Sequence, residues 1–338
     1  MKKIIIFSLV FLFGIGLLLS SGCSGKKNSK AHKTRIALVL SVGGLGDKSF
    51  NDMAYKGLMN AKERFNVSVA YAQPKQMAED EKFLRKYAES GFDLTIAVGF
   101  LMRDAVMKVA KEFPNSSFAI IDAVDTEDSN VASLVFREQE GSFLVGAIAG
   151  LMTKTNKVGF IGGMDIPLIH KFQLGYTEGV KYVNPKCDII STYVGSGPSA
   201  FHDPFTGKQL ALSTYSKGAD IIFHAAGSSG NGVIEAAAEK KLFAIGVDAD
   251  QNYMKPGYVL TSMVKRVDVA VYNIIKKVTT NQFKGGLYSF GLAEDGVDYA
   301  LDQYNKDLIP QSVIYEVNQL KNDIITGKIK VSDYTKLH

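Results

Sequence analysis

Short apolar segments alternate with amphipathic segments of helical length along most of this chain, and a turn joins each pair. Near-continuous apolar runs of this kind are typical of parallel strands that are buried on both faces. Their alternation with helices favours an α/β fold with a parallel sheet and helices on both sides of it. The predicted strands are residues 35–40, 67–72, 94–98, 117–121, 131–136, 157–161, 187–193, 221–225, 243–247 and 259–264.

The alternation runs in two consecutive series, which indicates two similar lobes. The roughly 305 residues after position 33 also exceed the size at which one hydrophobic core usually stops growing. We expect an N-terminal lobe of residues 34–153 and about 265–292, and a C-terminal lobe of residues 154–264 and about 293–338. The predicted helices are residues 53–65, 77–89, 102–113, 141–154, 167–184, 206–217, 230–240 and 267–279.

The last part of the chain repeats this pattern less clearly. Two glycines introduce the apolar residues 287–292, which predict one more strand. The basic residues at the end, 328–338, are expected to pack loosely.

The N-terminus has the order of charge, apolar core and small residues that marks an export signal. Its apolar run, residues 4–19, is shorter than the ~20 residues of a membrane-spanning helix. Small residues stand directly before Cys23, as in a lipobox, where the cysteine is acylated. We predict a lipoprotein signal peptide over residues 1–22, an acyl chain such as palmitate on Cys23, and a flexible basic tether over residues 23–33. The protein would then be exported and lipid-anchored at the cell membrane; the alternative is an ordinary secretory signal with an incidental cysteine.

The composition argues against several other classes of protein. Much of the net charge of +5 lies in the tether, so the folded part is close to neutral and gives little support to nucleic-acid binding. None of the five histidines has metal-ligand spacing from another, and the sequence has no nucleophile elbow. Cys187 lies in an apolar segment and is expected in the core. We therefore predict a binding protein without metal or cofactor rather than an enzyme.

The first predicted strand ends in a glycine-rich turn, residues 43–51, that leads into a helix. In open α/β sheets, ligands bind at the carboxyl ends of strands, where such turns lie. The turn differs from a phosphate loop because Asp47 stands where glycine should precede the Lys-Ser pair. Asp47, Ser49 and Asn51 offer hydrogen bonds and Phe50 offers a flat face, which suits a neutral, polar ligand with a ring. The alternative is a capped turn with Phe50 in the core.

Other polar and glycine positions also follow predicted strands. These are Asp122, Gly227, Asp248 and Lys265. The carboxyl ends of parallel strands meet at one edge, so two facing lobes would bring these residues and the turn to one cleft. Each residue alone is explained as well by a helix cap or a turn, but their convergence favours a ligand site. Glu138 and Glu140 are expected to cap a helix or face solvent rather than touch a ligand.

Several motifs together make the chain resemble the basic membrane protein family of lipoproteins, which includes the purine nucleoside receptors of ABC importers. The resemblance covers essentially the whole mature chain. The segments that carry it are residues 46–51, 118–122, 138–146, 157–163, 218–223, 245–251 and 259–268.

This resemblance implies a type I periplasmic-binding-protein fold, with two Rossmann-like lobes joined by a hinge. It implies a lipid-anchored substrate-binding protein that delivers purine nucleosides such as adenosine, guanosine and inosine to an ABC permease, with a separate ATPase supplying the energy. Two alternatives from the sequence remain: a receptor of the same fold for a sugar or another small molecule, and a surface adhesion lipoprotein that acts through its lysines.

The resemblance also implies roles for individual residues. A purine base would stack between two phenylalanines, of which Phe50 is one; Phe201 is the best match for the second and Phe205 the runner-up. Asn51 and Asp122 would read the base, whereas Asp248, Lys265 and the Gly227 backbone would hold the ribose. Asp47 would disfavour a phosphate, so we expect nucleosides to bind in preference to nucleotides and free bases.

Overall fold

The computed structural model describes residues 33–125 and 128–337. The predicted signal peptide, Cys23 and all but the last residue of the tether lie outside these ranges. Within them, no helix is both long and apolar enough to span a bilayer.

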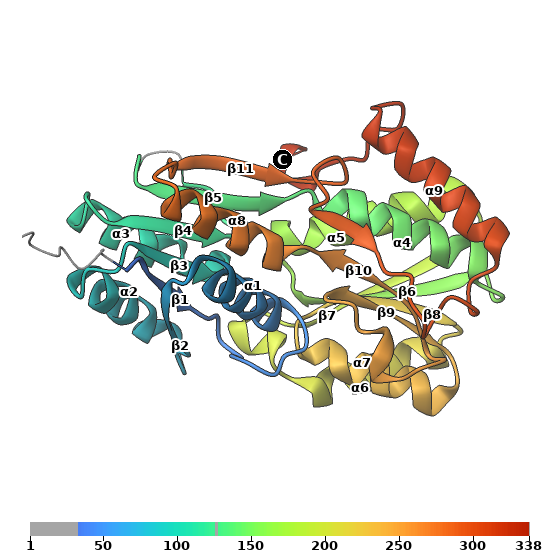
Figure 1. The fold of residues 1–338 in the computed structure, drawn as a ribbon. Coiled ribbons are helices and arrows are strands. Elements are labelled where there is room, and N and C mark those ends of the chain that lie inside the picture. Colours follow the sequence, from blue (N-terminus) through green and yellow to red (C-terminus); the bar gives the residue numbers. More distant parts are fainter. Residues whose placement is uncertain (1–32, 126–127, 338) are drawn as a thin grey trace, which may run out of the picture. The chain divides into compact units, whose positions relative to one another are not determined.

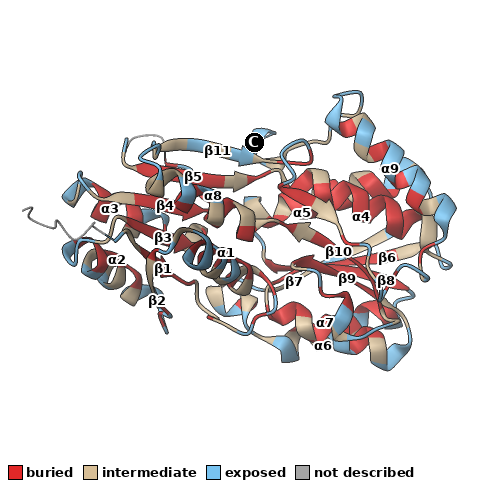
Figure 2. Ribbon diagram, viewed as in Figure 1, coloured by how far each residue is buried: buried red, intermediate tan, exposed pale blue. Residues whose placement is uncertain are grey.

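The first sheet is entirely parallel, with the strand order β11-β5-β4-β3-β1-β2 (Figure 1). Its central strands are almost fully buried (Figure 2), which explains their unbroken apolar sequence. Its strands are β1 (Arg35–Val39), β2 (Ser68–Ala72), β3 (Leu94–Val98), β4 (Ser117–Ile121), β5 (Val131–Phe136) and β11 (Gly286–Phe290).

The second sheet has the order β12-β10-β9-β8-β6-β7 and is parallel except for β12, which runs antiparallel to β10. All the strands predicted from the sequence are present, so the α/β prediction with two parallel sheets is confirmed. The strands are β6 (Lys157–Met164), β7 (Asp188–Gly195), β8 (Ile221–Ala225), β9 (Phe243–Asp248), β10 (Val259–Lys265) and β12 (Val297–Tyr299).

Each predicted helix is also found, with ends that differ by a few residues. The sequence analysis missed α9, although Ile314, Val317, Leu320 and Ile324 are buried at helical spacing. The helices are α1 (Phe50–Phe65), α2 (Asp80–Glu89), α3 (Arg103–Glu112), α4 (Glu138–Met152), α5 (Pro167–Val183), α6 (Pro204–Ser216), α7 (Ser229–Lys240), α8 (Val267–Thr279) and α9 (Gln311–Ile325), with short 3-10 turns that include η3 (Pro198–Phe201) and η5 (Tyr334–Lys336).

The helix α4 packs closely against α5 (Figure 1), because glycines face the neighbouring backbone. A Cβ atom added to Gly146 would lie 2.2 Å from the carbonyl oxygen of Tyr176, and one added to Gly179 would lie 2.0 Å from that of Phe143. The division into lobes stays a prediction. This packing nevertheless favours a first boundary near Arg137, where β5 ends, rather than at residue 153.

The end of the chain is held against α5, so the expectation of loose packing is wrong for residues 332–334. The backbone N–H of Ser332 donates a hydrogen bond of 2.9 Å to Oε2 of Glu178. The ring of Tyr334 stacks on His170 with 4.5 Å between the ring centroids. This packing could not be predicted from local sequence patterns, because the partners lie more than a hundred residues earlier in the chain.

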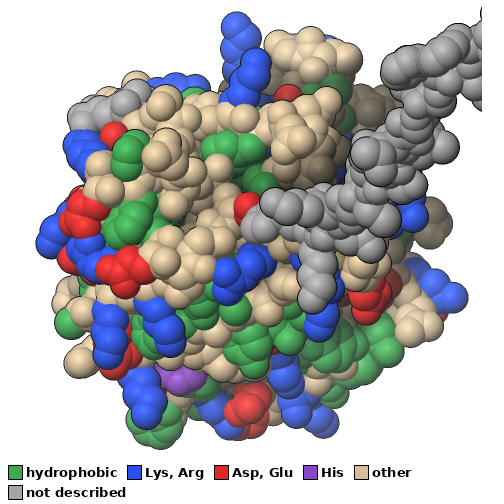
Figure 3. Space-filling model, turned by 60° about the vertical axis from the view of Figure 1, so that its left-hand side comes forward, with side chains coloured by type: hydrophobic (Ala, Val, Ile, Leu, Met, Phe, Trp, Pro, Cys, Tyr) green, Lys and Arg blue, Asp and Glu red, His purple; other side chains and the backbone are tan. Residues whose placement is uncertain are grey.

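Charged side chains are interspersed on the face of the molecule shown in Figure 3. Lys and Arg residues lie among Asp and Glu residues there, rather than gathered in one basic patch. On the described part of this face, the arrangement is that of an ordinary solvated surface.

Candidate functional site

A cavity of about 770 Å³, part of it open to solvent, lies where strand ends of both sheets meet. Every ligand-binding residue predicted from the sequence lines it. These residues are Asp47, Phe50, Asn51, Asp122, Phe201, Gly227, Asp248 and Lys265. The structure thus brings the whole predicted set together, whereas their contact with a ligand stays a prediction.

The side chains of Asp47 and Asn51 are hydrogen-bonded to each other and to nearby residues of the first turn. The carboxylate of Asp47 accepts hydrogen bonds from the backbone N–H groups of Ser49, Asn51 and Asp52 and from the side-chain amide of Asn51. Oδ1 of Asn51 accepts from the backbone N–H and hydroxyl of Ser41. Burial raises the pKa of Asp47, although these backbone hydrogen bonds oppose the shift. Ser49 is the N-cap residue of α1, but the Asp47 carboxylate accepts from the first N–H groups of the helix, so the capped-turn alternative describes its geometry well.

The same turn also contacts residues at and just after the end of β9, in the second sheet. The hydroxyl of Ser49 donates a hydrogen bond of 2.5 Å to Oδ2 of Asp248, and the side-chain amide of Gln251 donates one of 3.0 Å to the carbonyl oxygen of Lys48. These bonds join the start of α1 to the end of β9 across the cavity. The sequence analysis missed them because neither pair is close in sequence.

Two carboxylates at strand ends occupy a backbone region that most side chains avoid. Asp122 and Asp248 have φ values of 65° and 63°, in the left-handed region that aspartate tolerates better than most residues. Oδ1 of Asp122 is buried and has no hydrogen-bond partner among the described residues. Such an oxygen is a free acceptor at the cavity wall, and leaving it unpaired is costly. Burial raises the pKa of Asp248 to about 6, although Lys265 and Ser49 favour its ionised form.

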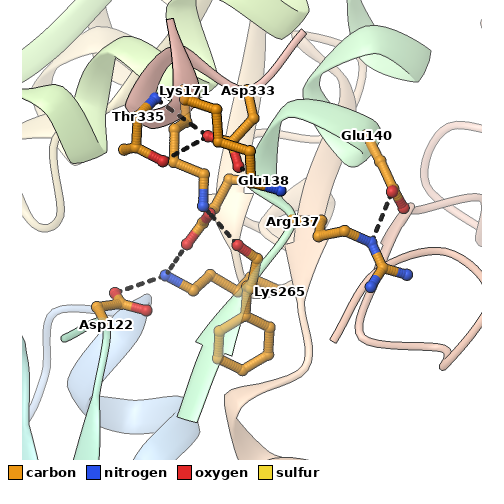
Figure 4. A network of polar contacts seen from close by, with 10 residues as sticks. Asp122, Arg137, Glu138, Glu140, Lys171, Lys265, Asp333 and Thr335 are labelled. Carbon is orange, nitrogen blue, oxygen red and sulfur yellow. Dashed lines mark hydrogen bonds and ion pairs between the residues drawn. The ribbon is translucent and has the colours of Figure 1, made fainter. Parts of the chain in front are cut away.

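Lys265 is a buried cation at the cavity wall, held between two carboxylates (Figure 4). Its Nζ lies 2.6 Å from Oδ2 of Asp122 and 3.1 Å from Oε1 of Glu138. The same Nζ lies 5.1 Å from the centre of the Phe50 ring, within the range of a cation–π contact. Burial alone would lower the pKa of Lys265, but Asp122, Glu138 and Asp248 together raise it above its ordinary value.

Glu138 is completely buried, which excludes one of the two roles expected for it, a side chain facing solvent; it does not line the cavity. It forms a second ion pair with Lys171 of α5, whose Nζ also donates a hydrogen bond of 2.6 Å to the carbonyl oxygen of Phe136. Burial would raise the pKa of Glu138, but the ammonium groups of Lys171 and Lys265 hold it below its ordinary value. Glu140, the other glutamate, pairs instead with Arg137.

Four phenylalanines give the cavity its flat apolar faces: Phe50, Phe100, Phe172 and Phe201. The structure favours Phe201 over Phe205 as the second aromatic residue, since Phe205 is 74% exposed and does not line the cavity. Sequence reasoning missed Phe100 and Phe172. Phe100 follows β3 almost directly, so its position at the carboxyl edge of the sheet could have indicated it.

Within residues 33–125 and 128–337, no group of three or more His, Cys, Asp and Glu side chains could hold a metal ion. Cys187 is buried, as expected for a core residue, and burial raises the pKa of its thiol. A thiol in this state is a poor nucleophile.

Two parallel sheets with a cavity at their facing strand ends define a solute-binding protein of the type I periplasmic fold. A crystal structure of an ABC transporter solute-binding protein from Aeropyrum pernix K1 is similar over 89% of this chain and 93% of that one, with a TM-score of 0.80 and 34% identity. The chain belongs to the Bmp family, described as ABC transporter substrate-binding protein PnrA-like, whose sequence model matches residues 33–335.

Two relatives of known sequence span nearly the whole chain. The ABC transporter nucleoside-binding protein BmpA of Lactococcus lactis is 32% identical over 98% of this chain and 99% of its own length. An uncharacterized lipoprotein of Pyrococcus furiosus is 34% identical over 97% of this chain and 88% of its own length. Membership of the family establishes the general class: a substrate-binding protein of ABC transporters.

Proposed function

We propose that this protein binds purine nucleosides in the cavity between its two sheets and delivers them to an ABC importer. The observation that carries the proposal is the convergence of aromatic faces, a free carboxylate oxygen and a carboxylate–lysine pair on one cavity. The nucleoside-binding name of the Lactococcus lactis relative supports the same ligand class.

Each part of a nucleoside has a suitable counterpart in the cavity. The rings of Phe50 and Phe201 offer stacking faces, and stacking on an aromatic side chain contributes ~1–3 kcal/mol per base. Oδ1 of Asp122 is free to accept a hydrogen bond from an N–H group of the base. Asp248 and Lys265 are placed to bind ribose hydroxyls through charge-assisted hydrogen bonds.

The charges of the cavity favour a nucleoside over its close relatives. Three carboxylates and one ammonium group line it, so the phosphate of a nucleotide would meet net negative charge. A free base would leave the ribose-binding groups without partners, at ~1–3 kcal/mol for each buried group. The oxygen and one N–H of the Asn51 amide are already bound to Ser41 and Asp47, which leaves its second N–H for a ligand.

The route of delivery forms the second part of the proposal. Cys23 carries the lipid anchor, and the tether that follows holds the binding domain outside the cytoplasm, near a permease with its ATPase. The lipoprotein name of the Pyrococcus furiosus relative supports this anchoring. Metabolic labelling with a palmitate analogue checks it, since label should be incorporated by the full chain and lost in Cys23→Ser.

Isothermal titration calorimetry on residues 33–338 tests the ligand class. Adenosine, guanosine and inosine should bind, whereas adenine, ribose and adenosine monophosphate should bind at least tenfold more weakly. Binding of ribose as tight as that of nucleosides would support a sugar receptor instead. Failure of every nucleoside to bind would reject the proposal.

A further inference from the structure

A chain of buried ion pairs leads from the cavity wall to Lys171 of α5, the helix on which the end of the polypeptide packs. Asp122 and Lys265 lie at the cavity, and Glu138 joins Lys265 to Lys171 behind it (Figure 4). Negative and positive charges alternate along this chain. Neither Glu138 nor Lys171 lines the cavity.

We infer that Glu138 and Lys171 are positioning residues that fix the ammonium group of Lys265 for a ribose-bearing ligand. This inference rests on the proposed nucleoside function and deepens it. An ammonium group has three N–H donors on a flexible stem. Two carboxylates on different elements, one after β4 and one at the start of α4, restrict its position. The remaining N–H is then available to the ligand.

Glu138 can restrict the position of the Lys265 ammonium group only if its own carboxylate is fixed and stays ionised. Its side chain is completely buried, and a buried carboxylate needs charge and hydrogen-bond partners to stay ionised. Lys171 supplies that charge and is fixed in turn by the carbonyl oxygen of Phe136, the last residue of β5. The pair from α4 and α5 is therefore a rigid support behind Lys265.

The C-terminal segment covers the outer end of this support. Lys171 is only 8% exposed, and residues 332–334 pack on its helix. Asp333 lies close to Lys171 in Figure 4. Burial would raise the pKa of Asp333, but hydrogen bonds from Thr335 and the positive charge of Lys171 hold it below its ordinary value. Asp333 and Lys171 thus interact electrostatically at the outer end of the ion pairs.

A paired neutral substitution tests the inference. Glu138→Gln combined with Lys171→Gln removes both charges, leaves the net charge unchanged and avoids an unpaired buried ion. The double variant should bind the preferred nucleoside at least tenfold more weakly, while its affinity for the corresponding free base changes less than threefold. Lys181→Gln, an exposed lysine on the same helix, is the matched control and should change neither affinity.

The ratio of nucleoside affinity to base affinity distinguishes a positioning role from general damage to the fold. Loss of positioning should weaken only the nucleoside, whereas a damaged fold should weaken both ligands. Equal weakening of both ligands, or no weakening of either, would overturn the inference. If the double variant does not fold, Asp333→Asn is tested in its place. It should weaken nucleoside binding two- to threefold and leave the affinity for the free base unchanged. If the unaltered protein binds no nucleoside, the proposed function is rejected, and this inference is rejected with it because it depends on that function.

Discussion

The hydroxyl of Ser49 donates a 2.5 Å hydrogen bond to Oδ2 of Asp248, joining the turn before α1 to the end of β9. Ser49 is completely buried and Asp248 is 6% exposed, so solvent does not compete for the bond. Ser49 lies in the turn between β1 of the first sheet and α1, whereas Asp248 ends β9 of the second sheet, so separating the sheets would break the bond. The bond therefore stabilises a form in which the two sides of the cavity are in contact.

Ser49→Ala should weaken nucleoside binding about tenfold. A hydrogen bond to a charged group contributes ~1.5–3 kcal/mol, and part of that stabilises the arrangement that encloses a ligand. Calorimetry measures the affinity, and small-angle X-ray scattering should show a larger radius of gyration for the ligand-free variant. Ser289→Ala, an exposed serine on β11, is the control. Unchanged affinity and scattering in Ser49→Ala would show that the bond does not hold the lobes together.

Phe201→Ala should weaken nucleoside binding tenfold to a hundredfold. The loss follows from the ~1–3 kcal/mol that stacking contributes per base. Phe205→Ala is a close control, because that side chain is exposed and lies only four residues away in the chain. Calorimetry with one purine nucleoside measures both. A larger loss in Phe205→Ala would reverse the assignment of the second aromatic residue.

Local periodicity explains why so much of the fold could be predicted. The strands of both sheets are short apolar runs, and β3 was predicted with its observed ends. The miss of β12 has a physical cause, since three residues, Val297–Tyr299, are too few to show a period. The positions of Asp122, Asp248 and Lys265 could be predicted because parallel strands end at a common edge.

The partners of the site residues could not be predicted in the same way. Lys171 and Glu138 are 33 residues apart and lie on different helices, so no local pattern relates them. The sequence equally gave no sign that Asn51 is already bound by Ser41 and Asp47. The positions of the strand ends determine which residues come to the common edge of a sheet. The hydrogen-bond and ion-pair partners of those residues depend instead on how helices and strands pack together.

Gly146→Ala should lower the free energy of unfolding by ~1–3 kcal/mol, as forced overpacking does. The new methyl group would lie 2.2 Å from the carbonyl oxygen of Tyr176, so the backbone of one of the two helices would have to shift. This cost exceeds the ~1 kcal/mol that alanine gains over glycine in a helix. Urea unfolding measures it. Gly197→Ala, where no atom lies within 4 Å of the added Cβ, should leave the stability unchanged. A stable Gly146→Ala would mean that α4 and α5 separate readily.

Asp248→Asn should stabilise the ligand-free protein at pH 8 and weaken nucleoside binding at least tenfold. Burial raises the pKa of Asp248 from its ordinary value of 3.8 to about 6. A raised pKa means that the folded protein favours the protonated carboxyl. The resulting contribution to the free energy of unfolding is fully present below the ordinary pKa and is lost as the pH rises through about 6. The ionised carboxylate therefore costs stability at pH 8, on the order of 2–3 kcal/mol.

The stability gained by Asp248→Asn should consequently be largest at pH 8 and shrink towards pH 5, where Asp248 is largely protonated. Thermal unfolding at both pH values measures the difference, and calorimetry at pH 8 measures the nucleoside affinity. Ser49 can still bind the amide oxygen, so a general loss of packing is not expected. If Asp248→Asn destabilises the protein at pH 8 and leaves nucleoside binding intact, the carboxylate serves the fold. If Asp248→Asn instead stabilises the protein at pH 8 and weakens nucleoside binding, the ionised carboxylate lowers the stability of the fold but is needed to bind the ligand.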